Sequence, residues 1–263
     1  MGHAATMPRT ASTALRVLTV AVGGGAAACS LGRALRHLGA SADERALAMP
    51  GDERLPDADI VSTRAVTICA PAEAVWPWLV QLGWGRAGWY SLDLVEAAIG
   101  AARSVDADGR RSWRSLRQIV PAHQHLAVGD RIPLHTRAGF DVVALEPGSY
   151  LVAEVAVGAG PASSTFSWTL MLVPDGEGAG CRLVARSRMR AGGPVRRLLL
   201  RALLDPGHAV MELAQLRGIR ERATALVAAT DDAPRACRVD RDRARRRRTQ
   251  LLPCTARWGR AVR

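Results

Sequence analysis

Two ionisable side chains, His208 and Glu212, lie four residues apart in a segment whose apolar residues recur with helical spacing. The apolar stripe consists of Ala209, Leu213, Leu216, Ile219, Ala223, Leu226 and Val227. Glu212 falls inside this stripe and His208 at its edge. Because unpaired burial of a carboxylate or an imidazole costs several kcal/mol, both groups need partners. They are candidates for a structural ion pair, for contact with a ligand, or for proton transfer.

Arg86 is the cation that we expect to pair with Glu212. It lies in a loop that also contains Gly83, Gly85 and Gly88. The spacing of these glycines matches neither a P-loop nor a dinucleotide fingerprint, so we predict no nucleotide and no other cofactor. Tyr90, which follows the loop, could present its hydroxyl group to a ligand.

Metal and covalent chemistry have little support in the sequence. His123 and His125 are two residues apart but lack a third ligand of suitable spacing. The five cysteines form no C-x-x-C pair, and no serine lies in a nucleophile-elbow motif. We therefore assign no metal ligand and no catalytic residue.

The elements that would position these side chains follow a clear order. Strands are expected at 63–69, 132–134, 141–145, 150–157, 165–173 and 181–190, and Phe166 and Trp168 share one face of their strand. In the last strand, Arg182, Arg186, Arg188 and Arg190 share the other face, where we expect them to meet solvent. Helices are expected at 71–82, with a kink at Pro77, at 90–99, and at 206–228 with Asp205 as the N-cap.

This order predicts an α+β helix-grip fold, in which a curved antiparallel sheet wraps around the long C-terminal helix. Such a curve leaves room for a cavity between the sheet and the helix, lined by apolar side chains. Phe166 and Trp168 are the best pair to line it, although filling of the core would explain them equally well.

Several segments also resemble a known family. They are residues 51–53, 68–83, 85–91, 166–168 and 206–212, and 70–91 is the most specific of them. Together they resemble the bacterial SRPBCC group, the START and polyketide-cyclase superfamily, over roughly residues 40–228. The resemblance implies the helix-grip fold and a cavity for a hydrophobic ligand, and it implies no particular activity. Residues 101–112 and the C-terminal tail lie outside the pattern.

Charge and composition divide the chain into four parts. Residues 1–38 hold an apolar run, Val17–Leu31, between arginines; it is shorter than the roughly 20 residues of a spanning helix, and we interpret it as a membrane anchor, a signal, or a packed helix. Residues 39–62 form a linker or strap, and 63–229 form the domain. Residues 230–263 are an arginine-rich tail without apolar periodicity, for which we predict disorder. The protein is then cytoplasmic, or membrane-associated through residues 1–38.

The sequence favours a binding protein over an enzyme, because no paired acid and base is evident. The expected partner is a small hydrophobic or amphipathic molecule or a lipid, with a membrane surface as a further candidate. The net charge of +12 comes largely from the tail, which lacks the interleaved aromatics and the fold of a nucleic-acid module, so nucleic acid is not expected. The predicted ligand-binding residues are Arg86, Tyr90, Phe166, Trp168, His208 and Glu212. The alternative is a cyclase- or dehydratase-like enzyme in which Glu212, with His208 or Tyr90, moves a proton in the same cavity.

Overall fold

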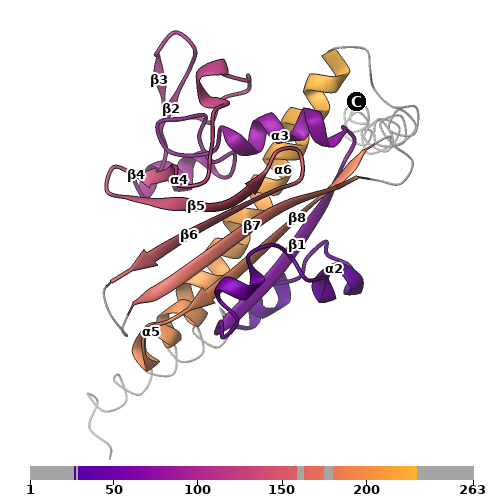
Figure 1. The fold of residues 1–263 in the computed structure, drawn as a ribbon. Helices are drawn as coiled ribbons and strands as arrows, with labels where there is room; N and C mark the ends of the chain where they lie inside the picture. Colours follow the sequence, from indigo (N-terminus) through magenta and orange to yellow (C-terminus); the bar gives the residue numbers. More distant parts are fainter. Residues whose placement is uncertain (1–26, 28, 159–162, 175–179, 230–263) are drawn as a thin grey trace, which may run out of the picture.

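The computed structural model describes residues 27, 29–158, 163–174 and 180–229, and within them an open six-stranded antiparallel sheet in the order β1-β8-β7-β6-β5-β4 (Figure 1). The strands are β1 (Ile60–Ile68), β4 (Arg131–His135), β5 (Ala138–Glu146), β6 (Tyr150–Val157), β7 (Ser164–Pro174) and β8 (Cys181–Arg190). The helix α6 (Asp205–Ala229) runs across one face of the sheet. This is the predicted α+β helix-grip fold.

Shorter elements surround this framework. They are α2 (Ala42–Ala46), η1 (Asp52–Arg54), α3 (Ala72–Val80), α4 (Asp93–Ala98), β2 (Ser104–Val105), β3 (Arg111–Ser112), η2 (Pro121–His123), α5 (Pro194–Leu199) and η4 (Leu200–Leu204). The ribbon β2–β3 lies within the stretch that departs from the family pattern.

The core lies between the sheet and α6. Alternation along β7 places Trp168, Leu170 and Leu172 on the face towards the helix, and all three are buried. On α6, Leu216 and Ile219 are buried at helical spacing and belong to the same cluster. The alternating apolar residues of the strand and the helically spaced apolar residues of α6 therefore pack into the same core.

The opposite face of the sheet is covered by residues 41–59, which include α2 and η1. The arginines of β8 pair with acidic residues of this strap: Arg182 with Glu44, Arg186 and Arg188 with Asp52, and Arg190 with Asp57. The expectation that they meet solvent is wrong for Arg186, whose side chain is only 4% exposed. An irregular acidic segment covers them, and nothing in the strand's own pattern signals it.

The outer edge of β1, which pairs with no other strand of the sheet, is covered by the residues that precede the strap. The Thr63 amide donates a hydrogen bond to the Arg36 carbonyl over 2.9 Å. Gly39 passes so close to the same edge that a Cβ there would lie 2.2 Å from the Ala65 carbonyl oxygen. Residues 36–39 thus run against the outer side of the first strand.

The long C-terminal helix has no N-cap at Asp205. That residue is helical (φ −60°, ψ −51°) and is preceded without a break by α5 and by the π-helical η4. A π-helical segment can accommodate the missing amide hydrogen of Pro206 inside a continuing helix. The Asp205 carboxylate accepts hydrogen bonds from Arg36 instead of capping the helix.

Within the described ranges, none of the helices combines the length and the apolar character that crossing a bilayer requires. Most of the apolar run from Val17 to Leu31 and the whole arginine-rich tail lie outside the described residues.

Candidate functional site

The carboxylate of Glu212, in the first half of α6, is where polar side chains of the sheet meet the helix. Trp168 Nε1 donates a hydrogen bond to its Oε1 over 2.9 Å, and Ser187 Oγ donates to the same oxygen over 3.0 Å. Arg64 Nη1 donates to Oε2 and forms an ion pair in which both side chains are buried. One carboxylate therefore ties β1, β7 and β8 to α6.

The strand register explains why these groups converge. Ser187 on β8 is paired with Ser62 on β1 and with Trp168 on β7. Arg64 lies two residues beyond Ser62, on the same face of β1. Glu212 projects from α6 onto this row, so its oxygens face hydroxyl, indole and guanidinium donors together.

Arg64 is held by more than its carboxylate partner. Its Nε donates to the Leu35 carbonyl over 2.9 Å, and its Nη1 also donates to Ser62 Oγ over 3.2 Å. Its Nη2 is buried without a hydrogen-bond partner in the part of the chain that the structure describes. These fixed contacts suit a structural cation better than one that moves during a reaction.

His208 lies one helical turn before Glu212, with Nε2 3.7 Å from Oε1 of the carboxylate. The ring packs edge-on against Phe166, with centroids 5.1 Å apart. About a quarter of the side chain is exposed, but Nδ1 is buried and has no hydrogen-bond partner among the described residues. His208 therefore presents one unsatisfied nitrogen beside an aromatic wall.

The charges of this pair follow from their surroundings. Burial alone would raise the pKa of Glu212, but the charges of His208 and Arg64 and the hydrogen bonds from Arg64 and Ser187 outweigh it and lower that pKa. Burial lowers the pKa of His208 below 6.5, with Glu212 opposing the shift. At neutral pH we therefore take Glu212 to be ionised and His208 to be neutral, so that Arg64 is the main counter-charge.

A continuous series of ring contacts leads from His208 into the core. Phe166 packs on Phe140 with centroids 5.5 Å apart, Phe140 on Trp168 at 5.9 Å, and Trp168 on Trp89 at 6.2 Å. Trp89 Nε1, at the far end, is buried and has no hydrogen-bond partner in the described ranges. The space between sheet and helix is thus occupied by aromatic side chains in mutual contact, and we call this series the aromatic line.

Arg86 does not pair with Glu212, which corrects the prediction from the sequence. Its Nη2 donates to the carbonyls of Val80 and His123, each over 2.7 Å. The backbone turns tightly beside it, because Gly83 and Gly88 exchange hydrogen bonds of 3.1 Å. Arg86 consequently fastens its own loop to η2, and Arg64 takes the role at Glu212.

Tyr90 makes its contacts with residues other than those around Glu212. Its hydroxyl oxygen accepts a hydrogen bond from Gln81 over 2.8 Å, and the Arg222 guanidinium lies 4.5 Å from the ring centroid. Burial raises the pKa of Tyr90, so the phenol stays protonated. Gly218 of α6 packs under it: a Cβ there would lie 2.1 Å from the Tyr90 carbonyl oxygen. Of the six predicted residues, the structure gathers Phe166, Trp168, His208 and Glu212, and it leaves out Arg86 and Tyr90.

Four residues of the site were not predicted as site residues: Arg64 and Ser187, which contact Glu212, and Phe140 and Trp89 of the aromatic line. Arg64 carried a signal, because it shares a face with Val66 and Ile68 in the alternating pattern of the first strand. A cation on a core-facing position requires a buried anion, and Glu212 is the acid inside the apolar stripe of α6. Ser187 likewise shared the apolar face of β8.

The histidines at 123 and 125 show no metal-site geometry. A ring nitrogen of His123 lies 3.0 Å from the Val105 carbonyl oxygen, at hydrogen-bond distance. Among the residues that the structure describes, no group of three or more His, Cys, Asp or Glu side chains could hold a metal ion.

Comparison with known proteins yields structural neighbours only. No family model matches the chain, and no curated protein matches it. Similar solved structures include MLL2253 of Mesorhizobium loti (18% identity, TM-score 0.33, 62% of this chain and 96% of that one) and a Thermobifida fusca protein (17%, 0.36, 63% and 94%). DynU16, a protein of the dynemicin biosynthetic locus, matches at 15% identity and TM-score 0.32, over 60% of this chain and 46% of that one.

These scores are too low to carry an argument about ligand or activity. The class of the protein rests on its own architecture: an open antiparallel sheet with a long C-terminal helix across one face is compatible with a START- or polyketide-cyclase-like fold. This fold fits a ligand-binding or a cyclase-like protein.

Proposed function

We propose that the protein binds a small apolar or amphipathic molecule between the sheet and α6, along the aromatic line. The observation that carries the proposal is the pair of unsatisfied polar atoms at its two ends, His208 Nδ1 and Trp89 Nε1. A buried polar atom without a partner costs about 1–3 kcal/mol. A ligand with an apolar body and one or two polar atoms would satisfy them and keep the contacts of the rings.

Entry of such a ligand requires the rings to separate, because they touch one another in this structure. Phe166 and its neighbour in the register, Val155, are the half-buried members of this wall. They lie where β6 and β7 approach the first turns of α6, beside His208. We place the entrance there.

The contacts of Glu212 favour binding over the proton-transfer alternative. A carboxylate that is paired with a buried arginine keeps its charge and orientation, which suits anchoring better than acid–base exchange. Tyr90, the other proposed partner in catalysis, lies among Gln81, Trp78 and Arg222 instead.

Fluorescence titration with N-phenyl-1-naphthylamine, a neutral apolar probe, tests the site. In the full chain we expect saturable enhancement, and Val155→Trp, which fills the entrance, should weaken binding at least tenfold. Ala156→Trp is the matched control: it adds the same ring at the next residue, on the opposite and exposed face of β6. Thermal melts establish that both variants fold.

Native mass spectrometry of the purified protein provides an independent measurement, in which we expect a co-purifying apolar molecule that Val155→Trp loses. Absence of saturable probe binding in the parent chain, or equal binding by the two tryptophan variants, would show that no ligand enters between β6, β7 and α6.

A further inference from the structure

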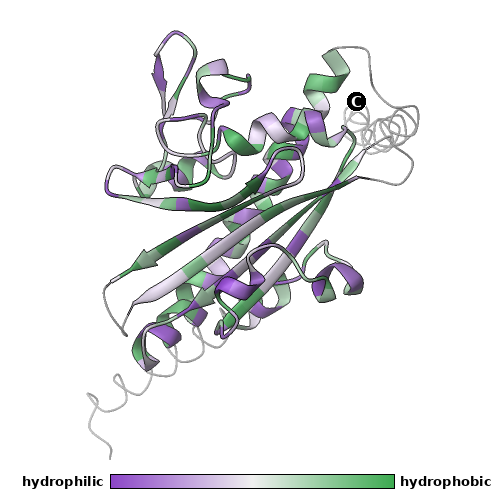
Figure 2. Cartoon of the chain, viewed as in Figure 1, coloured by the Kyte–Doolittle hydropathy of each residue, from purple (hydrophilic) through white to green (hydrophobic). Residues whose placement is uncertain are grey.

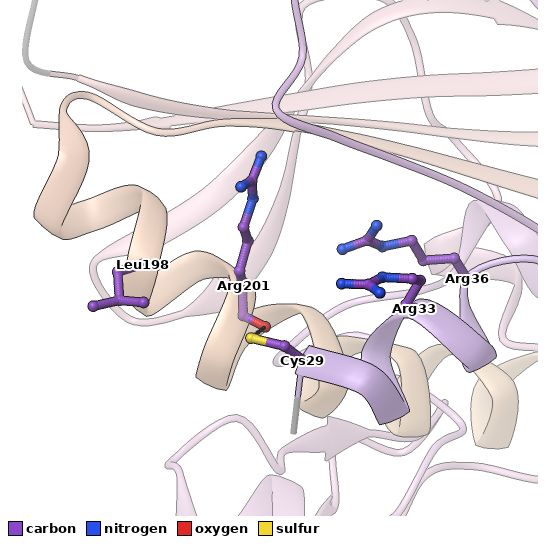
Figure 3. Close-up of a pocket in the computed structure, with 5 residues that line it drawn as sticks. All are labelled: Cys29, Arg33, Arg36, Leu198 and Arg201. Carbon is purple, nitrogen blue, oxygen red and sulfur yellow. Dashed lines mark hydrogen bonds between the residues drawn. The ribbon is translucent and has the colours of Figure 1, made fainter. Parts of the chain in front are cut away.

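A hollow lies outside the aromatic line, between the helical residues 29–35 and the end of α5 with η4. Its volume is about 480 Å³, and it is lined by Cys29, Arg33, Arg36, Leu198 and Arg201. Figure 3 shows Arg33 and Arg36 reaching from their helix across the hollow towards Arg201. We call it the arginine pocket.

The walls of the arginine pocket are fixed to each other by tight contacts. Gly32 lies against the start of α6, where a Cβ would come within 2.7 Å of Asp205 Oδ2. Arg36 donates to the same oxygen from Nε over 3.0 Å and from Nη2 over 2.8 Å. Cys29 Sγ donates to the Arg201 carbonyl over 3.5 Å. The helix is therefore seated on the α5–η4–α6 segment, and three arginine residues line the same hollow.

The charges in the arginine pocket do not balance. Asp205, fully buried, neutralises Arg36. Arg33 and Arg201 have no acidic partner among the residues that the structure describes. Positive charges that share one pocket repel each other, so an anion would stabilise it. Guanidinium groups match the oxygens of a phosphate especially well, because they donate in pairs.

The surroundings of the arginine pocket are apolar and exposed. Leu198 lines it and is 65% exposed, and Val195, Leu199, Leu203 and Leu204 are exposed on the same α5–η4 segment. The helix α5 carries both hydrophobic and hydrophilic residues (Figure 2). The apolar run that begins at Val17 ends at Leu31, inside the helix that forms the other wall. An anion attached to a hydrocarbon chain would match both the positive charges of the arginine pocket and the exposed apolar side chains beside it.

We propose that the arginine pocket binds the phosphate group of an anionic phospholipid at a membrane surface, with leucines of α5 and η4 entering the apolar layer. Basic residues beside exposed apolar side chains are the combination that holds proteins at anionic lipid interfaces. This binding involves residues distinct from those of the aromatic line, so either proposal can fail without the other.

Titration of the full chain with vesicles tests the electrostatic part. Vesicles of phosphatidylcholine with added phosphatidylglycerol should bind the protein more tightly than phosphatidylcholine alone, and salt should reduce the difference. Arg33→Ala and Arg201→Ala should each weaken binding to the anionic vesicles about fivefold. Arg220→Ala, which removes an exposed arginine further along α6, controls for the general loss of one charge. Losses no larger than that of Arg220→Ala would overturn the proposal.

A second comparison tests the apolar part and the source of the phosphate. Leu198→Asn should weaken vesicle binding, whereas Leu94→Asn, at a 75% exposed leucine on α4, should not. Equal losses for the two variants would contradict insertion of α5. Calorimetry with inorganic phosphate separates the sources: if free phosphate binds in an Arg33-dependent manner but anionic vesicles do not bind, the lipid assignment is wrong and the site serves a soluble phosphate.

Discussion

Arg64 on β1 and Glu212 on α6 form a buried ion pair between residues 148 positions apart in the chain. The pair joins the first strand of the sheet to the last helix, and Trp168 and Ser187 donate hydrogen bonds to the other carboxylate oxygen of Glu212. The closure of the helix onto the sheet is therefore specified at one point by charge as well as by apolar packing.

Removal of either partner of this pair should leave an uncompensated buried charge. We expect Glu212→Gln and Arg64→Met each to lower the free energy of unfolding by about 3–5 kcal/mol, and the double variant to lose less than the sum. Urea denaturation measures all three. Arg86→Met combined with Glu212→Gln is the control, because the structure places no contact between them. Additivity for Arg64 with Glu212, or strong coupling for Arg86 with Glu212, would contradict this assignment.

Stability should fall on acidification, and His208 should contribute. The folded pKa of His208 lies below its unfolded value of 6.5, so its contribution is fully present above pH 6.5 and is lost as the pH falls through the folded pKa. The lowered pKa of Glu212 gives a second loss, which begins below 4.5. Burial also lowers the pKa of His37, so His37 adds to the loss of stability on acidification in the same way as His208.

Urea denaturation between pH 7 and pH 5 tests this dependence. His208→Gln should reduce the slope of stability against pH. We attribute the slope that remains in this variant to His37. His125→Gln, at a histidine of the loop before β4, is the control. An unchanged slope in His208→Gln would show that the imidazole is not buried as the structure places it.

The strap should be held by its carboxylates. Asp52 accepts hydrogen bonds from Arg186 over 2.6 Å, from Arg188 over 3.2 Å and from the Met49 amide over 2.9 Å. Asp52→Asn should cost about 1–3 kcal/mol, because it leaves the buried Arg186 without its carboxylate. Asp108→Asn, in an exposed pair with Arg110, should change stability by less than about 0.5 kcal/mol. Limited proteolysis should cut the strap faster in Asp52→Asn alone; equal rates would refute this role.

Two glycines of α6 should respond to alanine in opposite directions. Gly218→Ala should destabilise the protein, because its Cβ would lie 2.1 Å from the Tyr90 carbonyl oxygen. Gly207 has no atom within 4 Å of a Cβ, so Gly207→Ala should stabilise the helix by up to about 1 kcal/mol. Thermal melts distinguish the two outcomes. Equal effects would mean that the loop before α4 does not rest on α6.

The fold could be predicted from the sequence because its periodicities are local. Alternation gave the strand 150–157 and the shared face of Phe166 and Trp168, and helical spacing gave the last helix. The start of that helix was misplaced, since Asp205 and Pro206 are typical of an N-terminus but lie within a longer helical run. A π-helical segment has no sequence pattern that would have revealed it.

The candidate site was predictable only in part, because strand register decides which side chains lie within hydrogen-bond distance of Glu212. Glu212 was identified as a buried acid in need of a cation, but the choice between Arg64 and Arg86 is made by contacts across the whole chain. The cover over the β8 arginines was hidden for a similar reason: residues 41–59 have no periodicity that links them to a sheet face. Whether the gathered residues bind a ligand stays a prediction.

The backbone contacts along β1 have a consequence for association between molecules. An uncovered edge strand offers unpaired backbone amides and carbonyls with which a strand of another chain can pair. Here residues 36–39 shield that side, and the other border, β4, carries Pro133, which has no amide hydrogen and whose carbonyl already accepts from Trp84. Detachment of residues 36–39 would therefore expose backbone amides and carbonyls of β1 to which a strand of another molecule could add.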